Sequence, residues 1–92
     1  MKPEQAEQIA IKALLWLSAN EEVFPLFLGS SGATADNLRE QAENPAFLGS
    51  VLEFLTMDDS WVVQFCDAEN LKYDQPLRAR YALPGSEQVH WT

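Results

Sequence analysis

The sequence predicts an all-α fold: a single small domain of about six short helices. Three observations predict it. Apolar residues recur at helical spacing in successive segments, residues that favour helix caps precede most of these segments, and the sequence resembles itself when offset by 38 residues. A chain of 92 residues has room for one compact core. We therefore expect one helical domain over residues 1–85, followed by an extended C-terminal tail over residues 86–92.

The first two helices are predicted before Gly32. Residues 3–18 carry apolar side chains at helical spacing, and Pro3 suits the first turn. Asn20 is a suitable cap for a second helix that begins at Glu21. Pro25 would then be the fifth residue of that helix, where its missing N–H removes a backbone hydrogen bond, so we expect a kink. Gly32 should end the helix in a left-handed conformation.

Two more helices are predicted on either side of Asn44. Thr34 should cap a short third helix over residues 35–43. Asn44 and Pro45 together provide a cap and a first-turn proline for a fourth helix, which is apolar on most of its surface. Gly49 within that helix lowers helix propensity, which indicates a close contact with another helix at this point.

The fifth helix is predicted from the internal repeat. Asp58 or Asp59 should begin a helix that extends to Glu69, but WVVQF at residues 61–65 would also suit a strand. At an offset of 38 residues, Asn20 aligns with Asp58, VFPLF aligns with WVVQF, and Gly32 aligns with Asn70. Glycine and asparagine are the residues that most readily adopt the left-handed conformation at a helix end. We therefore expect two copies of a three-helix unit, with WVVQF helical.

The sixth helix should occupy residues 75–82, directly after Asp74, and carry Leu77 and Tyr81. The stretch Leu83-Pro84-Gly85 should end it. An alternative is a β-hairpin that turns at PGSE. In this hairpin the apolar residues Tyr81, Leu83, Val89 and Trp91 would alternate with other residues along the two strands. In the first interpretation Trp91 lies in the tail, where we expect its indole to dock either on the chain's own helices or on a second copy.

Two long stretches of this sequence resemble a known family. They are GATADNLREQAENPAFLGSVLEFLTMDDSWVVQFCDAENL and RARYALPG, and the resemblance extends over roughly residues 6–85. The chain resembles domain-of-unknown-function family 3572, short uncharacterised proteins of alphaproteobacteria. The resemblance implies no catalytic or binding residues.

The inventory of reactive residues does not favour an enzyme. The single histidine, His90, lies two residues from the C-terminus, where it would not be held against a substrate. Cys66 is the single cysteine and should be a small buried residue of the fifth helix. FLGSSG at residues 27–32 lacks the lysine and the strand-to-helix context of a phosphate loop. No spacing typical of a metal site occurs. We expect no enzymatic activity, no cofactor and no metal.

Charge and aromatic content favour a protein that binds other proteins. The net charge is −8, and the acids are concentrated before residue 71, so we do not expect nucleic acid as a partner. No apolar run is long enough to span a membrane and no secretion signal is visible, which favours a cytoplasmic protein. We expect a regulatory or interaction module that binds another protein or a second copy of itself, and the candidate partner surface comprises Trp61, Trp91, Arg78 and Arg80. The alternative is a module for a small molecule or nucleic acid that uses the basic C-terminal helix.

Overall fold

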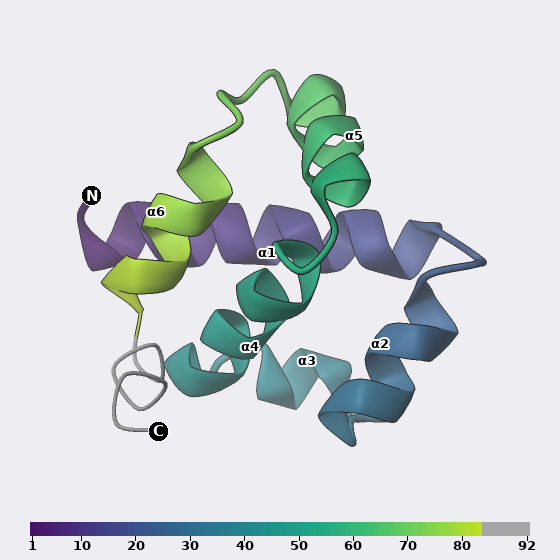
Figure 1. Ribbon diagram of the computed structural model, residues 1–92. Coiled ribbons are helices and arrows are strands. Elements are labelled where there is room, and N and C mark those ends of the chain that lie inside the picture. The colour runs from purple at the N-terminus through teal and green to yellow at the C-terminus, as the bar shows by residue number, and fades with distance from the viewer. Residues whose placement is uncertain (84–92) are drawn as a thin grey trace, which may run out of the picture.

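The computed structural model describes residues 1–83, which form six α-helices and no strand. The longest helix, α1, spans the width of the molecule, and the others lie across or beside it (Figure 1). The fold class predicted from the sequence is therefore confirmed. The helices are α1 (Pro3–Ala19), α2 (Phe24–Ser31), α3 (Leu38–Gln41), α4 (Pro45–Leu55), α5 (Asp59–Glu69) and α6 (Gln75–Ala82).

One hydrophobic core joins the helices. Helix α1 presents a single buried face to it, whereas α4 is buried on most of its surface, and α1, α4 and α6 pack against one another. Gly49 is among the buried residues of α4. Burying an aliphatic or aromatic side chain stabilises a fold by about 1.5–3 kcal/mol, so this shared core dominates stability. Its fully buried large side chains are Phe27, Phe65, Leu17, Leu48, Leu52, Leu55 and Val51, and Ile9, Leu14 and Phe47 belong to the same cluster.

Helix α2 begins later than the sequence predicts. Asn20 does cap the segment, because its side-chain oxygen accepts hydrogen bonds from the N–H groups of Glu22 and Val23 at 3.1 and 3.2 Å. Residues 21–23 nevertheless form a turn, and the helix starts at Phe24. Pro25 therefore lies in the first turn, where N–H groups have no partner within the helix. The prediction that Pro25 removes a hydrogen bond from within the helix was therefore wrong.

Helix α3 is shorter than predicted, and Thr34 does not cap it. Residues 35–37 form a turn and the helix comprises only Leu38–Gln41. The side chain of Asn37 accepts a hydrogen bond from the Thr34 N–H at 3.0 Å. An asparagine that bonds to the nearby backbone in this way favours a turn over a helix, which explains the late start.

The starts of α4 and α5 are confirmed. The Asn44 side chain accepts from the Ala46 N–H at 3.0 Å, and one Asp58 carboxylate oxygen accepts from the N–H groups of Ser60 and Trp61. Residues 61–65 lie within α5, so WVVQF is helical.

The predicted helix ends at Gly32 and Asn70 are confirmed as well. Their φ angles are 75° and 58°, both left-handed. Each residue donates its N–H to the carbonyl four residues earlier, at Leu28 and Cys66 respectively.

Helix α6 has the predicted bounds, but Leu77 and Tyr81 do not face the core. Pro76 and Ala79 are its buried residues and pack in the region where α6 meets α1 and α4. The helix ends at Ala82 with Leu83 as its C-cap, where the sequence predicts the end. Pro84 and Gly85, most of the alternative hairpin and the tail lie outside the described residues. Within residues 1–83, no helix is both long enough and apolar enough to cross a membrane.

Candidate functional site

Trp61 lies on α5 as part of an aromatic cluster. Its side chain is half-buried, and its ring stacks on that of Phe54 from α4, with centroids 5.1 Å apart and planes 19° apart. Phe54 is itself 8% exposed. The indole of Trp61 therefore covers the core with one face, and only the remainder can meet a partner.

Arg78 and Arg80 lie on α6, away from this cluster. Nη1 of Arg78 is 3.7 Å from Oδ2 of Asp74, one turn earlier, and both side chains are exposed. The Arg80 guanidinium carbon lies 5.9 Å from the centroid of the Tyr81 ring. The predicted partner surface therefore comprises residues from two separate clusters, and its fourth member, Trp91, lies outside the described residues.

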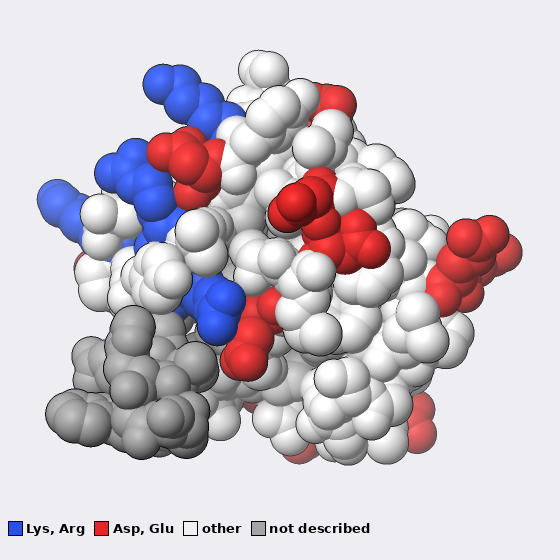
Figure 2. Space-filling model, viewed as in Figure 1, with Lys and Arg blue, Asp and Glu red and all other residues white. Residues whose placement is uncertain are grey.

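A basic groove is lined by residues from the first part of α1 and from α6. Lys12 and Arg78 are its cations, and its volume is about 290 Å³. The remaining lining is mostly uncharged: Met1, Gln5, Gln8, Ile9, Leu71 and Gln75. Figure 2 shows basic side chains gathered on this side of the molecule, with acidic side chains beside some of them, while separate acidic patches lie on the rest of a mostly uncharged visible face.

An acidic groove lies at the other end of α1, and we call it the Trp16 groove. It is lined by Trp16, Ala19, Asn20, Glu21, Glu22 and Gln64, and its volume is about 490 Å³. Trp16 is half-buried, with its ring edge-on to Phe65 of α5 at a centroid distance of 6.3 Å and an angle of 71°. An aromatic surface thus lies beside two exposed carboxylates, an arrangement that the sequence alone did not single out.

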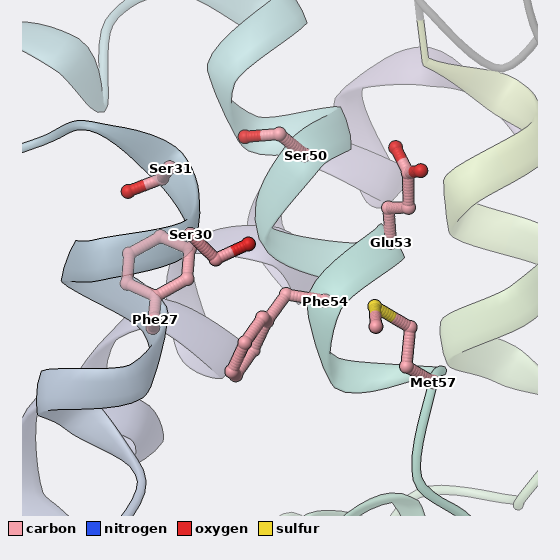
Figure 3. A pocket seen from close by; sticks show the side chains of 7 residues that line it. All are labelled: Phe27, Ser30, Ser31, Ser50, Glu53, Phe54 and Met57. Carbon is pink, nitrogen blue, oxygen red and sulfur yellow. The ribbon is translucent and has the colours of Figure 1, made fainter.

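A smaller cavity of about 200 Å³ lies between α2 and α4 (Figure 3). The rings of Phe27 and Phe54 meet edge-to-face beneath it, 5.4 Å apart at 70°. Ser30 on α2 and Ser50 on α4 point into the gap between the two helices, and Met57 lies at the far end. Phe27 is 1% exposed, so the aromatic floor offers little surface to a ligand.

The two aromatic contacts are related by the 38-residue offset. Phe27 corresponds to Phe65, and Phe54 corresponds to Trp16, so the pair from α2 and α4 recurs as the pair from α5 and α1. Each short helix packs on the long helix of the other unit. The 38-residue offset pairs these residues in the sequence. The structure adds that each aromatic contact joins a helix of the first unit to a helix of the second.

Cys66 is fully buried, as the sequence predicts. Its Sγ donates a hydrogen bond to the carbonyl oxygen of Lys72 at 3.5 Å. Burial raises the pKa of the Cys66 thiol, and the nearby carboxylates of Asp67 and Asp74 raise it further. A thiol that is both buried and protonated is a poor nucleophile.

Comparison with known families decides the membership of this chain. The model of a protein family of unknown function, DUF3572, matches residues 3–86. The chain belongs to this family. Its members are described only as proteins of unknown function, so membership assigns no activity. Neither the search of curated proteins nor that of solved structures found a match.

Proposed function

We propose that this member of DUF3572 is a non-catalytic interaction module, which binds a basic segment of a partner protein in the Trp16 groove. One observation carries the proposal: the half-buried indole of Trp16 lies in the same groove as the exposed carboxylates of Glu21 and Glu22. The proposed ligand is an arginine or lysine side chain within an extended peptide.

The groove suits a cation for two reasons. A guanidinium or ammonium group placed over an indole gains about 0.5–2 kcal/mol from the ring's quadrupole. A carboxylate at the rim adds a charge-assisted hydrogen bond, and arginine can form two in parallel. Gln64 on α5 offers a further polar group to the backbone of such a peptide.

The charge of the whole chain also supports a basic partner. A net charge of −8 attracts cationic segments before contact and increases their rate of association. The acids that have structural roles lie elsewhere, since Asp58 caps α5 and Asp67 accepts a hydrogen bond from Tyr73. Glu21 and Glu22 therefore provide charge that the helix caps do not use.

Within the described residues, the reactive side chains support a non-catalytic role. Cys66 is buried, and in residues 1–83 no three side chains of His, Cys, Asp or Glu group as metal ligands would.

A second candidate is a small anionic ligand or nucleic acid on the basic side of the molecule. The groove that contains Lys12 and Arg78 favours it. Asp74 lies 3.7 Å from Arg78, however, and reduces the positive potential there. Two cations in an acidic chain neutralise few phosphates, so nucleic-acid binding would be weak and steeply dependent on salt.

A peptide titration tests the proposal. The probe is a synthetic peptide of alternating arginine and glycine, and isothermal titration calorimetry measures its affinity for the full chain. The variant Glu21→Gln/Glu22→Gln should weaken binding about 10-fold, which corresponds to about 1.4 kcal/mol. The control variant Glu40→Gln/Glu43→Gln removes the same charge from exposed positions around the end of α3 and should weaken binding far less. Equal effects of the two variants, or no binding of the peptide at millimolar concentration, would contradict the proposal.

A further inference from the structure

The basic groove has hydrogen-bond donors on both of its walls. On α1, Gln5, Gln8 and Lys12 follow one another at intervals of three and four residues, which places them on one face of the helix. On α6, Gln75 and Arg78 are three residues apart and also share a face. Helices α1 and α6 pack against each other, so the two rows line one groove. Among the described residues, no aspartate or glutamate lines it, although the chain has 14 acidic side chains against six basic ones.

Two of the three glutamines already use their amide oxygen. Oε1 of Gln75 accepts a hydrogen bond from the Lys72 N–H at 2.8 Å, and Oε1 of Gln5 accepts one from the Lys2 N–H at 3.3 Å. A backbone N–H bonds to the oxygen of an amide and not to its nitrogen, so these two contacts leave each NH₂ group available as a double donor. The uncharged part of the groove therefore offers donors to an acceptor.

The positive charge of the groove suits one negative charge. Nη1 of Arg78 is 3.7 Å from Oδ2 of Asp74, and the two side chains are 60% and 61% exposed. Exposed ion pairs of this kind are weak, so the guanidinium is available to a ligand. Lys12 and Arg78 together with Asp74 carry a net charge of +1, which matches a monoanion better than a doubly charged phosphate.

The apolar lining and the volume limit the size of the ligand. Ile9 is buried and Leu71 is half-buried, and both line the groove. Its volume of about 290 Å³ lies at the lower end of the range for ligand sites, about 300–1,000 Å³. A ligand that fits is small and has a short apolar part.

We infer that the basic groove binds the carboxylate of a small organic acid, whose short hydrocarbon chain lies over Ile9 and Leu71. An arginine holds a carboxylate through two parallel hydrogen bonds, and the glutamine NH₂ groups supply further donors. The chain's net charge of −8 does not prevent this, because exposed charges more than about 8 Å apart are largely screened at physiological salt. The site does not depend on the Trp16 groove, which involves the other end of α1.

A titration followed by nuclear magnetic resonance tests the site. The probe is sodium hexanoate, added to the full ¹⁵N-labelled chain in about 150 mM NaCl. The side-chain NH₂ signals of Gln5, Gln8 and Gln75 should shift and saturate with a Kd of about 1 mM. Hexanamide has the same size but no charge and should bind at least about 10-fold more weakly.

Three results would overturn the inference. The first is no shift of these NH₂ signals up to about 20 mM hexanoate. The second is equal binding of hexanamide, which would mean that the groove does not recognise charge. The third is tighter binding of inorganic phosphate than of hexanoate, which would mean that the carboxylate is the wrong ligand class.

A matched pair of glutamine variants tests the donors. Gln75→Glu retains an oxygen that accepts from the Lys72 N–H but replaces the NH₂ donor with negative charge, so it should weaken hexanoate binding by about 10-fold or more. Gln41→Glu adds the same charge at another half-buried glutamine, which lies on α3 and does not line the groove. It should change the Kd by less than about 2-fold. Equal effects of the two variants would contradict the inference.

A second pair tests the cation. Lys12→Gln removes a charge from the groove and should weaken hexanoate binding by about 5-fold, whereas Lys72→Gln removes an exposed charge outside the lining and should have a much smaller effect. Circular dichroism of all four variants establishes that the helices are retained. Binding that is unchanged in Lys12→Gln would show that the charge of the groove does not hold the ligand.

Discussion

Two left-handed residues end α2 and α5, and they are different kinds of residue. Gly32 and Asn70 have φ angles of 75° and 58°, and each N–H bonds to the carbonyl four residues earlier. Glycine adopts this conformation freely, and asparagine does so more readily than other residues with a Cβ. A helix that ends in the left-handed conformation needs a residue that tolerates it, and Gly32 and Asn70 are such residues.

Substitution by alanine should have opposite effects at two neighbouring glycines. A Cβ at either Gly29 or Gly32 would meet no atom within 4 Å, so only the backbone conformation decides the outcome. Gly32→Ala should destabilise the fold by about 1 kcal/mol, because alanine is strained at positive φ. Gly29→Ala should stabilise it by up to about 1 kcal/mol, because Gly29 lies within α2. Urea denaturation of the two variants measures both values.

Asn70→Gly completes this series. Glycine relieves the remaining strain at φ 58° but has more conformational freedom in the unfolded chain, so we expect a neutral or slightly stabilising change. If Gly32→Ala were as stable as the natural chain, strain at φ 75° would not matter to the fold.

Some features of single residues could be predicted from the sequence, and others could not. The left-handed ends were predictable because residue type alone selects that conformation. The outward position of Leu77 and Tyr81 was not, because α6 buries Pro76 and Ala79 and so turns its large side chains to solvent. Periodicity shows which residues share a face, but not which face meets the core. The place of Trp16 beside Glu21 likewise depends on the bend between α1 and α2.

At the scale of the helices, hydrogen bonds recur at the 38-residue offset. Asn20 accepts from the second and third N–H groups after it, and so does Asp58. The Thr34 N–H bonds to the side chain of Asn37, and the Lys72 N–H bonds to the side chain of Gln75 at 2.8 Å. The caps at Asn44 and Asp58 explain why the starts of α4 and α5 were predicted, whereas α2 and α3 begin later than predicted because a turn precedes each of them. The length of α3 was not predicted, since this helix has only four residues, whereas α6 has the predicted bounds.

The cap of α5 should respond to pH. Hydrogen bonds from Ser60, first from its hydroxyl, lower the pKa of the Asp58 carboxyl. A group with a lowered pKa in the folded state stabilises the fold above its unfolded pKa of about 3.9, and this contribution is lost as pH falls through the folded pKa. The melting temperature of the natural chain should therefore exceed that of Asp58→Asn at pH 6, and the difference should shrink below about pH 4.

Asparagine is the right comparison because it caps a helix about as well but does not ionise. Other carboxyl groups titrate equally in both proteins, so the difference between them isolates Asp58. A difference that stays constant from pH 6 to pH 2 would mean that the charge of Asp58 contributes nothing to the cap.

At the scale of the whole molecule, the two units pack across one another. Helix α2 of the first unit meets α4, and α5 of the second meets α1, through the related pairs Phe27–Phe54 and Phe65–Trp16. The third helices differ, because α6 packs on both α1 and α4 while α3 is a single short turn of helix. That the two three-helix units superpose stays a prediction. The two units thus differ most in their third helix.

The charge of the whole molecule should make its stability depend on salt. The chain carries 14 acidic and six basic side chains, and the ion pair found within residues 1–83, Arg78–Asp74, leaves this excess unchanged. The screening length is about 30 Å at 10 mM salt and about 10 Å at 100 mM. The molecule measures 29 × 27 × 25 Å, so at low salt nearly all its carboxylates repel one another, whereas at 100 mM only neighbours do.

Repulsion relaxes when the chain unfolds and expands, so screening should favour the folded state. We expect the melting temperature to rise by several degrees between about 10 and 150 mM NaCl. The variant Glu21→Lys/Glu22→Lys halves the net charge from −8 to −4 at exposed positions and should show a clearly smaller rise. Chloride is the right anion, since sulfate also strengthens apolar burial and would raise both melting temperatures for another reason. If the natural chain melted at the same temperature at both salt concentrations, the acidic excess would be balanced locally, and the charge argument for a basic partner would lose its support.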